Sequence, residues 1–167
     1  RGHVLAVERH PGRARAMTRT CSRMRAGCVD IRIADAAALE AGGSYDRVLV
    51  DPPCSGLGTL QSRPDLRWRI TPESIEELAA TQARILRAGA AATRPGGVLV
   101  YSLCTISQTE SHRVLEEFLG ERSDFSAEDL SAEHPELTDP RCASYLQLLP
   151  PRDRTDGFFI ARLRRHD

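Results

Sequence analysis

The sequence predicts an α/β fold with a mostly parallel sheet that ends in a C-terminal antiparallel hairpin. Short apolar runs bounded by turn residues are typical of strands covered on both faces of a parallel sheet. These runs alternate with segments of helical periodicity, and right-handed crossovers make the first four strands parallel. The last two runs are separated by a short proline-rich turn, which indicates a hairpin.

The composition is that of one ordinary globular domain. The chain has 167 residues, of which 41% are hydrophobic and 28% are charged. This length is sufficient for one α/β domain with its own core. No apolar run is long enough to span a membrane and no signal peptide is visible, so we expect a cytoplasmic protein. The formal net charge is zero, and total charge therefore predicts no nucleic-acid partner.

The first half of the chain is predicted to contain three strands and one helix. Each strand is an apolar run followed by an acidic residue, and the three runs are residues 4–7, 29–34 and 47–50. The helix, at residues 11–26, is ended by Gly27. Its apolar stripe is predicted to consist of Ala14, Met17, Thr18, Cys21 and Met24. Residues 36–44 are short and irregular.

A long connection at residues 52–70 follows the third strand, and such length inside one domain indicates a functional loop. Thr71 and Pro72 predict the start of a helix, as N-cap and first helical residue. A Pro-Gly-Gly turn at residues 95–97 ends this helix and leads into a fourth strand at residues 98–104. The buried stripe is predicted to consist of Ile75, Leu78, Ala79, Gln82, Ile85 and Leu86.

A third helix is expected at residues 107–120, because Ser107 and Glu110 have the spacing of a capping box. Its inward residues are predicted to be Val114, Leu115, Phe118 and Leu119. Residues 123–141 are polar and predicted to be irregular. The hairpin at one sheet edge follows, with its first strand, turn and second strand at residues 145–149, 150–156 and 157–163.

Two strands lead into a cysteine. The third ends at Asp51, because Pro52 and Pro53 have no N–H to donate to a sheet, and Cys54 follows. The fourth runs into Cys104. If the two strands are neighbours, an acid and two thiols meet at the carboxyl edge of the sheet, where open α/β folds bind ligands. The alternative is that both cysteines are buried structural residues.

Three acidic residues close successive strands, namely Glu8, Asp35 and Asp51. In doubly wound sheets an acid after the second strand often holds ribose hydroxyls, and Asp35 could accept from an adenine amino group. Each acid taken singly fits a turn residue equally well. Three of them on one edge predict a cofactor that contains a nucleoside.

Two thiols and an acid suit methylation of a pyrimidine at carbon 5, which is too weak a nucleophile to attack a methyl sulfonium unaided. Addition of a thiolate to carbon 6 makes an enamine, and carbon 5 then attacks. The carboxyl of Asp51 can stabilise ring nitrogen 3 during this addition, and a second thiol can assist the final elimination. A free thiol has a pKa of about 8.5, so the site must favour the attacking thiolate.

Trp68 is the only tryptophan, and Arg63, Arg67 and Arg69 lie close to it in sequence. The indole can stack on an RNA base while the arginines hold phosphates. Alternatively, the ring anchors the loop to the domain and the arginines are solvated. Both interpretations stay open on the sequence alone.

The remaining cysteines and the histidines predict no metal site. The five histidines are scattered, and the cysteine spacings fit no zinc pattern. Cys21 lies in the apolar stripe of the first helix and is expected to act as a small hydrophobic residue. Cys28 and Cys142 have no motif around them, which indicates structural or incidental roles.

These segments resemble a known family. Asp51-Pro-Pro-Cys54-Ser-Gly-Leu-Gly58 and Tyr101-Ser-Leu-Cys104-Thr105 are similar to motifs of the RNA cytosine-5 methyltransferases, above all the bacterial ribosomal small-subunit group (the Sun or Fmu proteins). Residues 63–68, 95–97 and 156–159 are also similar to that group. The resemblance covers nearly the whole chain. It implies a class I, Rossmann-like methyltransferase fold, S-adenosylmethionine as cofactor and 16S-type ribosomal RNA as substrate.

The resemblance also implies a role for each site residue. Cys104 is the nucleophile and Cys54 assists release of the product. Glu8 holds the cofactor's ribose, Asp35 holds its adenine, and Asp51 lies near both the methyl donor and the cytosine. DNA cytosine-5 enzymes use the cysteine of their Pro-Cys motif instead, so Cys54 is the rival nucleophile; they lack the Cys104 motif, which favours the RNA type.

Two other functions remain as alternatives. Amino-group methyltransferases have an Asp/Asn-Pro-Pro motif that resembles Asp51-Pro-Pro, but they place an aromatic residue next, where this sequence has Cys54. A catalytically inactive RNA-binding fragment is the second alternative. The two intact cysteines argue against it for the parent protein.

The family has a glycine-rich loop with a lysine before the strand that ends in Glu8, and this sequence begins after that point. We therefore expect residues 1–167 to be part of a catalytic domain that lacks its first strand, with a gap at the sheet centre. We also expect this chain alone to bind the cofactor weakly or not at all. A micromolar affinity in a calorimetric titration would contradict this expectation.

Overall fold

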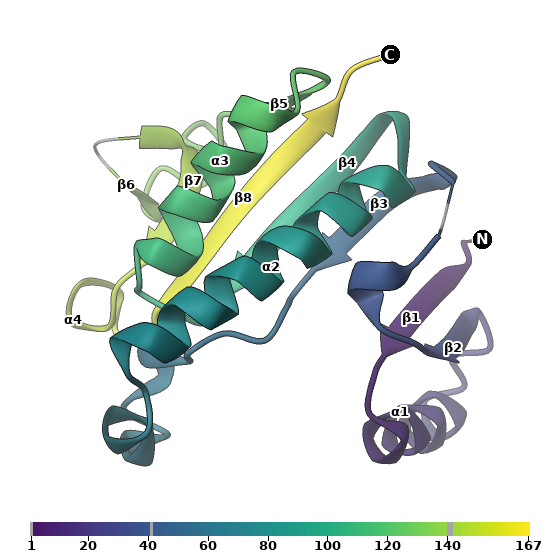
Figure 1. Cartoon of the computed structure of the whole chain (residues 1–167), viewed down its shortest axis with the longest axis horizontal. Coiled ribbons are helices and arrows are strands. Elements are labelled where there is room, and N and C mark those ends of the chain that lie inside the picture. The colour runs from purple at the N-terminus through teal and green to yellow at the C-terminus, as the bar shows by residue number, and fades with distance from the viewer. Residues whose placement is uncertain (1, 41, 140–141) are drawn as a thin grey trace.

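The structure is a computed structural model that describes residues 2–40, 42–139 and 142–167. It contains two sheets (Figure 1). In the smaller sheet, β1 (Val4–Glu8) and β2 (Val29–Ile33) pair in parallel, and α1 (Pro11–Arg23) connects them. The larger sheet has six strands in the order β3-β4-β8-β7-β6, and β5 also pairs with β8.

The larger sheet is parallel at one end and antiparallel at the other. β3 (Tyr45–Val50) and β4 (Thr93–Leu103) pair in parallel through the crossover helix α2 (Pro72–Ala92). β8 (Phe158–Arg165) runs antiparallel to β4. The outer strands, all antiparallel to their neighbours, are β7 (Cys142–Leu148), β6 (Thr138–Asp139) and β5 (Phe125–Ala127). The predicted parallel strands and the C-terminal hairpin are both confirmed, but the expected edge position of the hairpin is wrong, because β6 pairs with β7 beyond it.

The expected gap lies between β1 and β3. Within the described ranges, β1 pairs only with β2, and β3 pairs only with β4. Figure 1 shows α2 and α3 (Val114–Glu121) on one face of the larger sheet. The prediction that β3 is covered on both faces is wrong, because the side chain of Leu49 points to the other face and is 69% exposed. Val50 points toward the helices and is buried.

The hydrophobic core fills the space between the larger sheet and these two helices. The predicted stripe of α2 is confirmed, with Ala79, Gln82 and Leu86 buried. The stripe of α3 is confirmed by Val114, Leu115 and Phe118. From the sheet, the fully buried hydrophobic residues are Leu99, Tyr101, Leu103, Phe159, Ala161 and Leu163.

The apolar stripe of α1 is only partly covered. Ala14 is buried, Met17 and Cys21 are half-buried, and Met24 is 63% exposed. The helix ends at Arg23, earlier than predicted, and Arg25 follows in the left-handed region with φ 55°. A two-stranded sheet presents too little apolar surface to bury the whole stripe, which explains the exposure.

The other differences from the predicted elements are local. β4 begins at Thr93 rather than at residue 98, so it includes the Pro-Gly-Gly turn. The long connection contains two 3-10 turns, Leu57–Thr59 and Pro64–Trp68, and the turn of the hairpin contains α4 (Pro150–Asp153). Residues 123–141 were predicted to be irregular but contribute β5 and β6, which complete the antiparallel part of the sheet; residues 140 and 141 lie outside the described ranges.

Of the helices that the structure describes, none has the length and apolarity needed to cross a membrane.

Candidate active site at the carboxyl ends of β3 and β4

The two cysteine loops leave neighbouring parallel strands. Val50 of β3 is in register with Tyr101 of β4, so both strands end at the same edge. The Sγ atoms of Cys54 and Cys104 lie 3.3 Å apart, and both side chains are half-buried. The backbone N–H of Gly58 donates to the carbonyl of Cys104 at 3.2 Å, which links the two loops directly. The structure therefore brings both predicted thiols to one point.

The thiol of Cys54 resists ionisation. Burial is the main cause that raises its pKa to about 12, and the hydrogen bond to Cys104 and the charges of Cys104 and Glu110 raise it further, against a hydrogen bond from the backbone N–H of Gly56 that lowers it. At neutral pH, Cys54 is therefore an S–H group rather than a thiolate. Either sulfur can donate the proton in the contact between Cys54 and Cys104.

This raised pKa predicts slow alkylation of Cys54. Iodoacetamide reacts with the thiolate, and at pH 8 a thiol with a pKa near 12 is ionised at roughly one part in ten thousand. We expect Cys54 to react at least about 100-fold more slowly than the exposed Cys28 at pH 8. The rate at Cys54 should rise about tenfold per pH unit beyond pH 10, whereas an ordinary thiol levels off above about pH 9. Peptide mass spectrometry measures both rates, and a plateau for Cys54 below pH 10 contradicts the prediction.

Asp51 follows β3 directly. The residue is exposed, but partial burial of its carboxyl group raises the pKa of this side chain. Asp51 precedes Cys54 by two prolines, of which Pro52 is buried and fixes the backbone between them. The acid and the thiol are thus held on one short, stiff segment.

The other two predicted acids lie beyond the gap, at the ends of β1 and β2. Glu8 accepts from the backbone N–H of His10 at 2.6 Å and forms an ion pair with Arg13 at 3.3 Å. Asp35 caps a short 3-10 turn by accepting from the N–H of Ala37 at 2.9 Å. Both carboxylates thus also make the turn contacts that the alternative interpretation expects. Their remaining lone pairs can accept from hydroxyl and amino groups, which suits a nucleoside.

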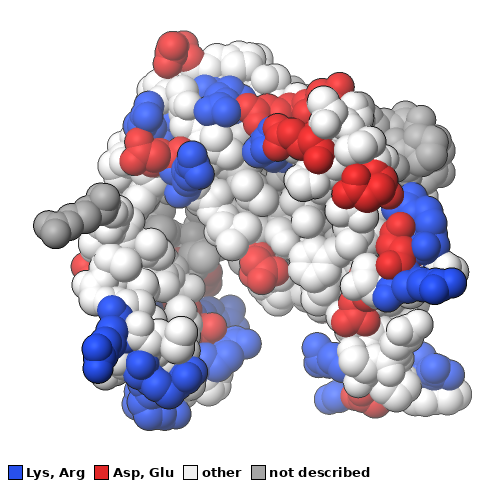
Figure 2. Space-filling view, turned by 180° about the vertical axis from the view of Figure 1, so that it is seen from behind, with Lys and Arg blue, Asp and Glu red and all other residues white. Residues whose placement is uncertain are grey.

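Trp68 does not anchor its loop. Its side chain is 83% exposed, at the end of the 3-10 turn Pro64–Trp68. Leu66 is the buried residue of this turn instead. Figure 2 shows basic side chains on this projection, at the lower right, and on the projection formed by α1, at the lower left. Arg63, Arg67 and Arg69 are exposed, and Arg69 pairs with Asp65 at 3.3 Å.

Glu110 is a site residue that sequence reasoning missed. The spacing to Ser107 predicted a capping role, but its carboxylate turns inward and is fully buried. It accepts from both the N–H and the hydroxyl of Ser55, from Gln82 and from Thr105. The capping-box prediction is therefore wrong, because the inward hydrogen bonds outnumber the single one that a cap offers. Ser55 and Thr105, the polar residues directly after the two cysteines, were the sequence feature that could have indicated a shared polar partner.

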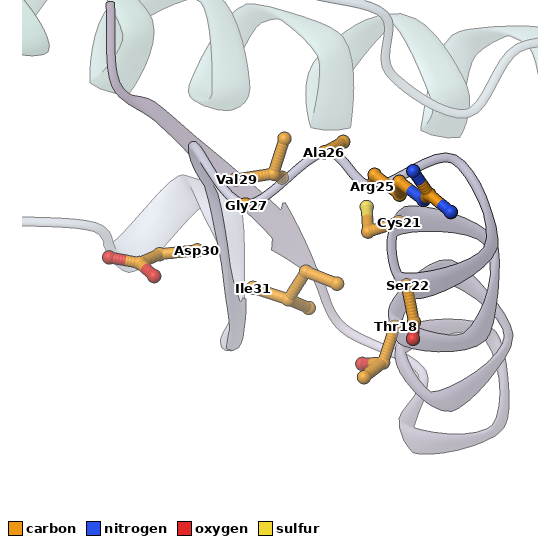
Figure 3. Close-up of a pocket in the computed structure, with 9 residues that line it drawn as sticks. All are labelled: Thr18, Cys21, Ser22, Arg25, Ala26, Gly27, Val29, Asp30 and Ile31. Atoms are coloured by element: carbon orange, nitrogen blue, oxygen red, sulfur yellow. The ribbon is translucent and has the colours of Figure 1, made fainter.

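A hollow of about 510 Å³ lies away from the thiols, between α1 and β2. Figure 3 shows Thr18 and Cys21 on the helix side and Val29 and Ile31 on the strand side. This is the place where the stripe of α1 was expected to be covered. Cys21 is half-buried at this hollow rather than fully inside a core.

Residues able to bind a metal do not gather in the described ranges, where no three His, Cys, Asp or Glu side chains form a cluster. The side chain of Cys142 lies outside the part of the structure that can be described.

Comparisons with known proteins identify a family and several relatives that are similar to this chain. The family described as 16S rRNA methyltransferase RsmB/F matches residues 1–164. Among curated proteins, the probable ribosomal RNA small subunit methyltransferase B of Synechocystis is 37% identical over 98% of this chain and 38% of its own length. The ribosomal RNA small subunit methyltransferase B of Thermus thermophilus is 40% identical over 71% of this chain and 29% of its own.

Solved structures are also similar to this chain. NSun6 from Pyrococcus horikoshii, solved with SFG, an analogue of S-adenosylmethionine, superposes with a TM-score of 0.86 at 30% identity, over 100% of this chain and 42% of its own. A methyltransferase homolog protein from the same organism has a TM-score of 0.80 at 27% identity, over 98% of this chain and 53% of its own. The class I methyltransferase fold and the resemblance to the Sun or Fmu proteins are confirmed.

The chain spans a little over a third of the length of the Synechocystis relative. The match to the family nevertheless runs from residue 1 to residue 164, across both cysteine loops and both sheets. The chain therefore belongs to the 16S rRNA methyltransferase RsmB/F family.

Proposed function

We propose that the full-length gene product transfers a methyl group from S-adenosylmethionine to carbon 5 of a cytosine in small-subunit, 16S-type ribosomal RNA. The observation that carries this proposal is the 3.3 Å contact between the sulfur atoms of Cys54 and Cys104 at two adjacent strand ends. The names of the relatives support ribosomal RNA as the substrate. The SFG in the NSun6 structure supports the cofactor.

Cys104 forms the covalent bond in this mechanism. Its thiolate adds to carbon 6 of the cytosine, and the electron pair of the 5,6 double bond moves to carbon 5. Bound S-adenosylmethionine would supply an electrophilic methyl group: carbon 5 would form a C–C bond to it while the methyl–sulfonium bond breaks, and S-adenosylhomocysteine would leave. A base, such as a water molecule, then takes the proton from carbon 5, the C–H electron pair restores the 5,6 double bond, and the thiolate of Cys104 leaves.

The other side chains support these steps. Partial burial raises the pKa of Asp51, and its carboxyl group lies at the strand end where it can stabilise ring nitrogen 3 as the thiolate adds. Cys54 assists elimination from its position beside the sulfur of Cys104. The motif around Cys104, which DNA cytosine-5 enzymes lack, argues against the rival assignment of Cys54 as the nucleophile. Glu8 and Asp35 hold the nucleoside part of the cofactor through their acceptor oxygens.

The nature of the product tests the proposal. The full-length protein is incubated with S-adenosylmethionine that carries a labelled methyl group and with unmethylated small-subunit ribosomal RNA, and the RNA is digested to nucleosides. We expect label in 5-methylcytidine. Label in N4-methylcytidine or N6-methyladenosine supports the amino-group alternative, and RNA binding without any methylated nucleoside supports the non-enzymatic one.

We also propose that Trp68, Arg63 and Arg67 bind the RNA. The substitution Trp68→Ala should lower affinity for ribosomal RNA about tenfold, because one stacked base contributes about 1–3 kcal/mol. Folding should not change, because the ring is 83% exposed. Fluorescence anisotropy measures the affinity, and Trp68→Phe, which retains an aromatic face, is the control. Equal affinities of the wild-type and Trp68→Ala proteins contradict the prediction.

A further inference from the structure

Glu110 is a fully buried carboxylate beside the two cysteine loops. Oε1 accepts from the N–H of Ser55 at 2.8 Å and from Nε2 of Gln82 at 2.9 Å. Oε2 accepts from the hydroxyls of Ser55 and Thr105. Burial of a carboxylate is costly unless hydrogen bonds replace its hydration, and four neutral donors do so here. Burying a carboxylate costs more free energy than burying an apolar side chain, so packing alone does not explain this residue.

The donors come from both cysteine loops. Ser55 is the residue after Cys54, and Thr105 is the residue after Cys104. The hydroxyls of Ser55 and Thr105 also contact each other at 2.9 Å. One carboxylate thus binds the immediate neighbours of both thiols, and its loss would release both loops at once.

Glu110 is itself held from two directions. Gln82 of α2 donates both to Oε1 and to the carbonyl of Pro53, at 2.9 Å each. The hydroxyl of Tyr101 in β4 donates to the backbone carbonyl of Glu110 at 2.8 Å. The residue lies in the π-helical turn Thr109–Arg113, an irregularity that is frequent at functional sites because it redirects side chains.

We propose that Glu110 is a positioning residue for methyl transfer, which holds the loops of Cys54 and Cys104 together so that their sulfur atoms face the same base. The proposal rests on the function proposed above. Burial is the main cause of the raised pKa of Cys54, and the charge of Glu110 contributes to it, so the same carboxylate also helps to keep this thiol protonated.

The first test measures the geometry of the thiols without any substrate. Dibromobimane bridges two adjacent thiols: each sulfur displaces one bromide, two C–S bonds form and the product is fluorescent. In the wild-type full-length protein we expect the reagent, once bound to one thiol, to bridge Cys54 and Cys104 despite the raised pKa of Cys54, because the second sulfur lies only 3.3 Å away. Peptide mass spectrometry maps the bridged product. In Glu110→Gln, whose amide cannot accept from all four donors, we expect bridging at least fivefold slower, although loss of the charge lowers the pKa of Cys54 and would by itself speed its reaction. The control is Glu116→Gln, an exposed glutamate on α3, which should bridge at the wild-type rate.

The second test measures turnover. We expect Glu110→Gln to lower kcat at least tenfold with KM for RNA within about twofold, because loosened loops misplace the thiols but do not touch the RNA backbone. Ser55→Ala removes one of the hydroxyl donors and should lower kcat in the same direction. Its effect should add little to that of Glu110→Gln, since the hydroxyl of Ser55 acts through its hydrogen bond to Glu110. If Glu110→Gln does not fold, Ser55→Ala gives the decisive measurement.

The outcomes separate the two proposals. The positioning role is overturned, and the methylation proposal stays intact, if folded Glu110→Gln bridges and turns over at the wild-type rates. Where Glu110→Gln does not fold, the same result in Ser55→Ala overturns the positioning role. If Glu110→Gln bridges slowly and the wild-type protein makes no 5-methylcytidine, the positioning of the two thiols by Glu110 is supported and the methylation proposal is refuted. A change in KM alone, with normal bridging, also overturns the positioning role.

Discussion

Cys104→Ala is expected to abolish methylation and to prevent the covalent adduct that the wild-type full-length protein forms with RNA containing 5-fluorocytosine. Fluorine at carbon 5 cannot leave as a proton does, so the wild-type adduct is trapped and survives denaturation. Without the Cys104 thiolate, no bond to carbon 6 forms and carbon 5 stays a weak nucleophile. We expect the methylation rate to fall on the order of 10⁴-fold or more. Denaturing electrophoresis detects the adduct.

Cys54→Ala is the matched control for this experiment, because its sulfur lies only 3.3 Å from that of Cys104. It should still form the trapped adduct, and adduct should also accumulate on ordinary RNA when release is impaired. If instead Cys104→Ala crosslinks and Cys54→Ala does not, the two roles are reversed. An absence of accumulation on ordinary RNA counts against the release role of Cys54.

Gly58→Ala is expected to destabilise the protein by about 3 kcal/mol, which is large for the addition of one methyl group. A Cβ at this position would lie 2.1 Å from the carbonyl oxygen of Gly157, and backbone atoms cannot rotate out of the way as a side chain can. The N–H of Gly157 donates to the carbonyl of Gly58 at 2.8 Å, so the clash would also break this bond. Urea unfolding measures the loss of stability.

Gly120→Ala provides the control for this substitution. It lies in α3, has no atom within 4 Å of its added Cβ, and should leave stability unchanged or slightly raised. Gly58→Ala should also slow methylation in the fraction that folds, because the N–H of Gly58 holds the carbonyl of Cys104. Equal urea midpoints for Gly58→Ala and Gly120→Ala contradict the prediction.

Much of the fold follows from local patterns. The strands near residues 48–50 and 98–103 are apolar runs stopped by turn residues, and a parallel crossover places such strands side by side. Their neighbouring positions in the sheet then bring Asp51, Cys54 and Cys104 to one edge. The start of α2 was equally local, because Thr71 caps the helix and Pro72 opens it.

The same reasoning failed where long-range contacts outweigh local preference. Ser107 and Glu110 fit a capping box, but four donors brought together by α2, β3 and β4 turn the carboxylate inward. The apolar run of β3 predicts that Leu49 is buried, yet its side chain is 69% exposed. The sequence of a strand does not determine which face of the sheet is covered. Trp68 reads equally well as an anchor or as a binding residue until Leu66 is seen to occupy the buried position.

The sequence by itself determined which residues end the strands, and therefore which acids and thiols reach the carboxyl edge, because turn residues and apolar spacing act within a few positions. Only the tertiary structure decided how these groups meet: the 3.3 Å between the two sulfur atoms and the buried carboxylate that joins their loops. These features depend on contacts between segments far apart in the chain. Local sequence does not determine which distant residue contacts a given side chain.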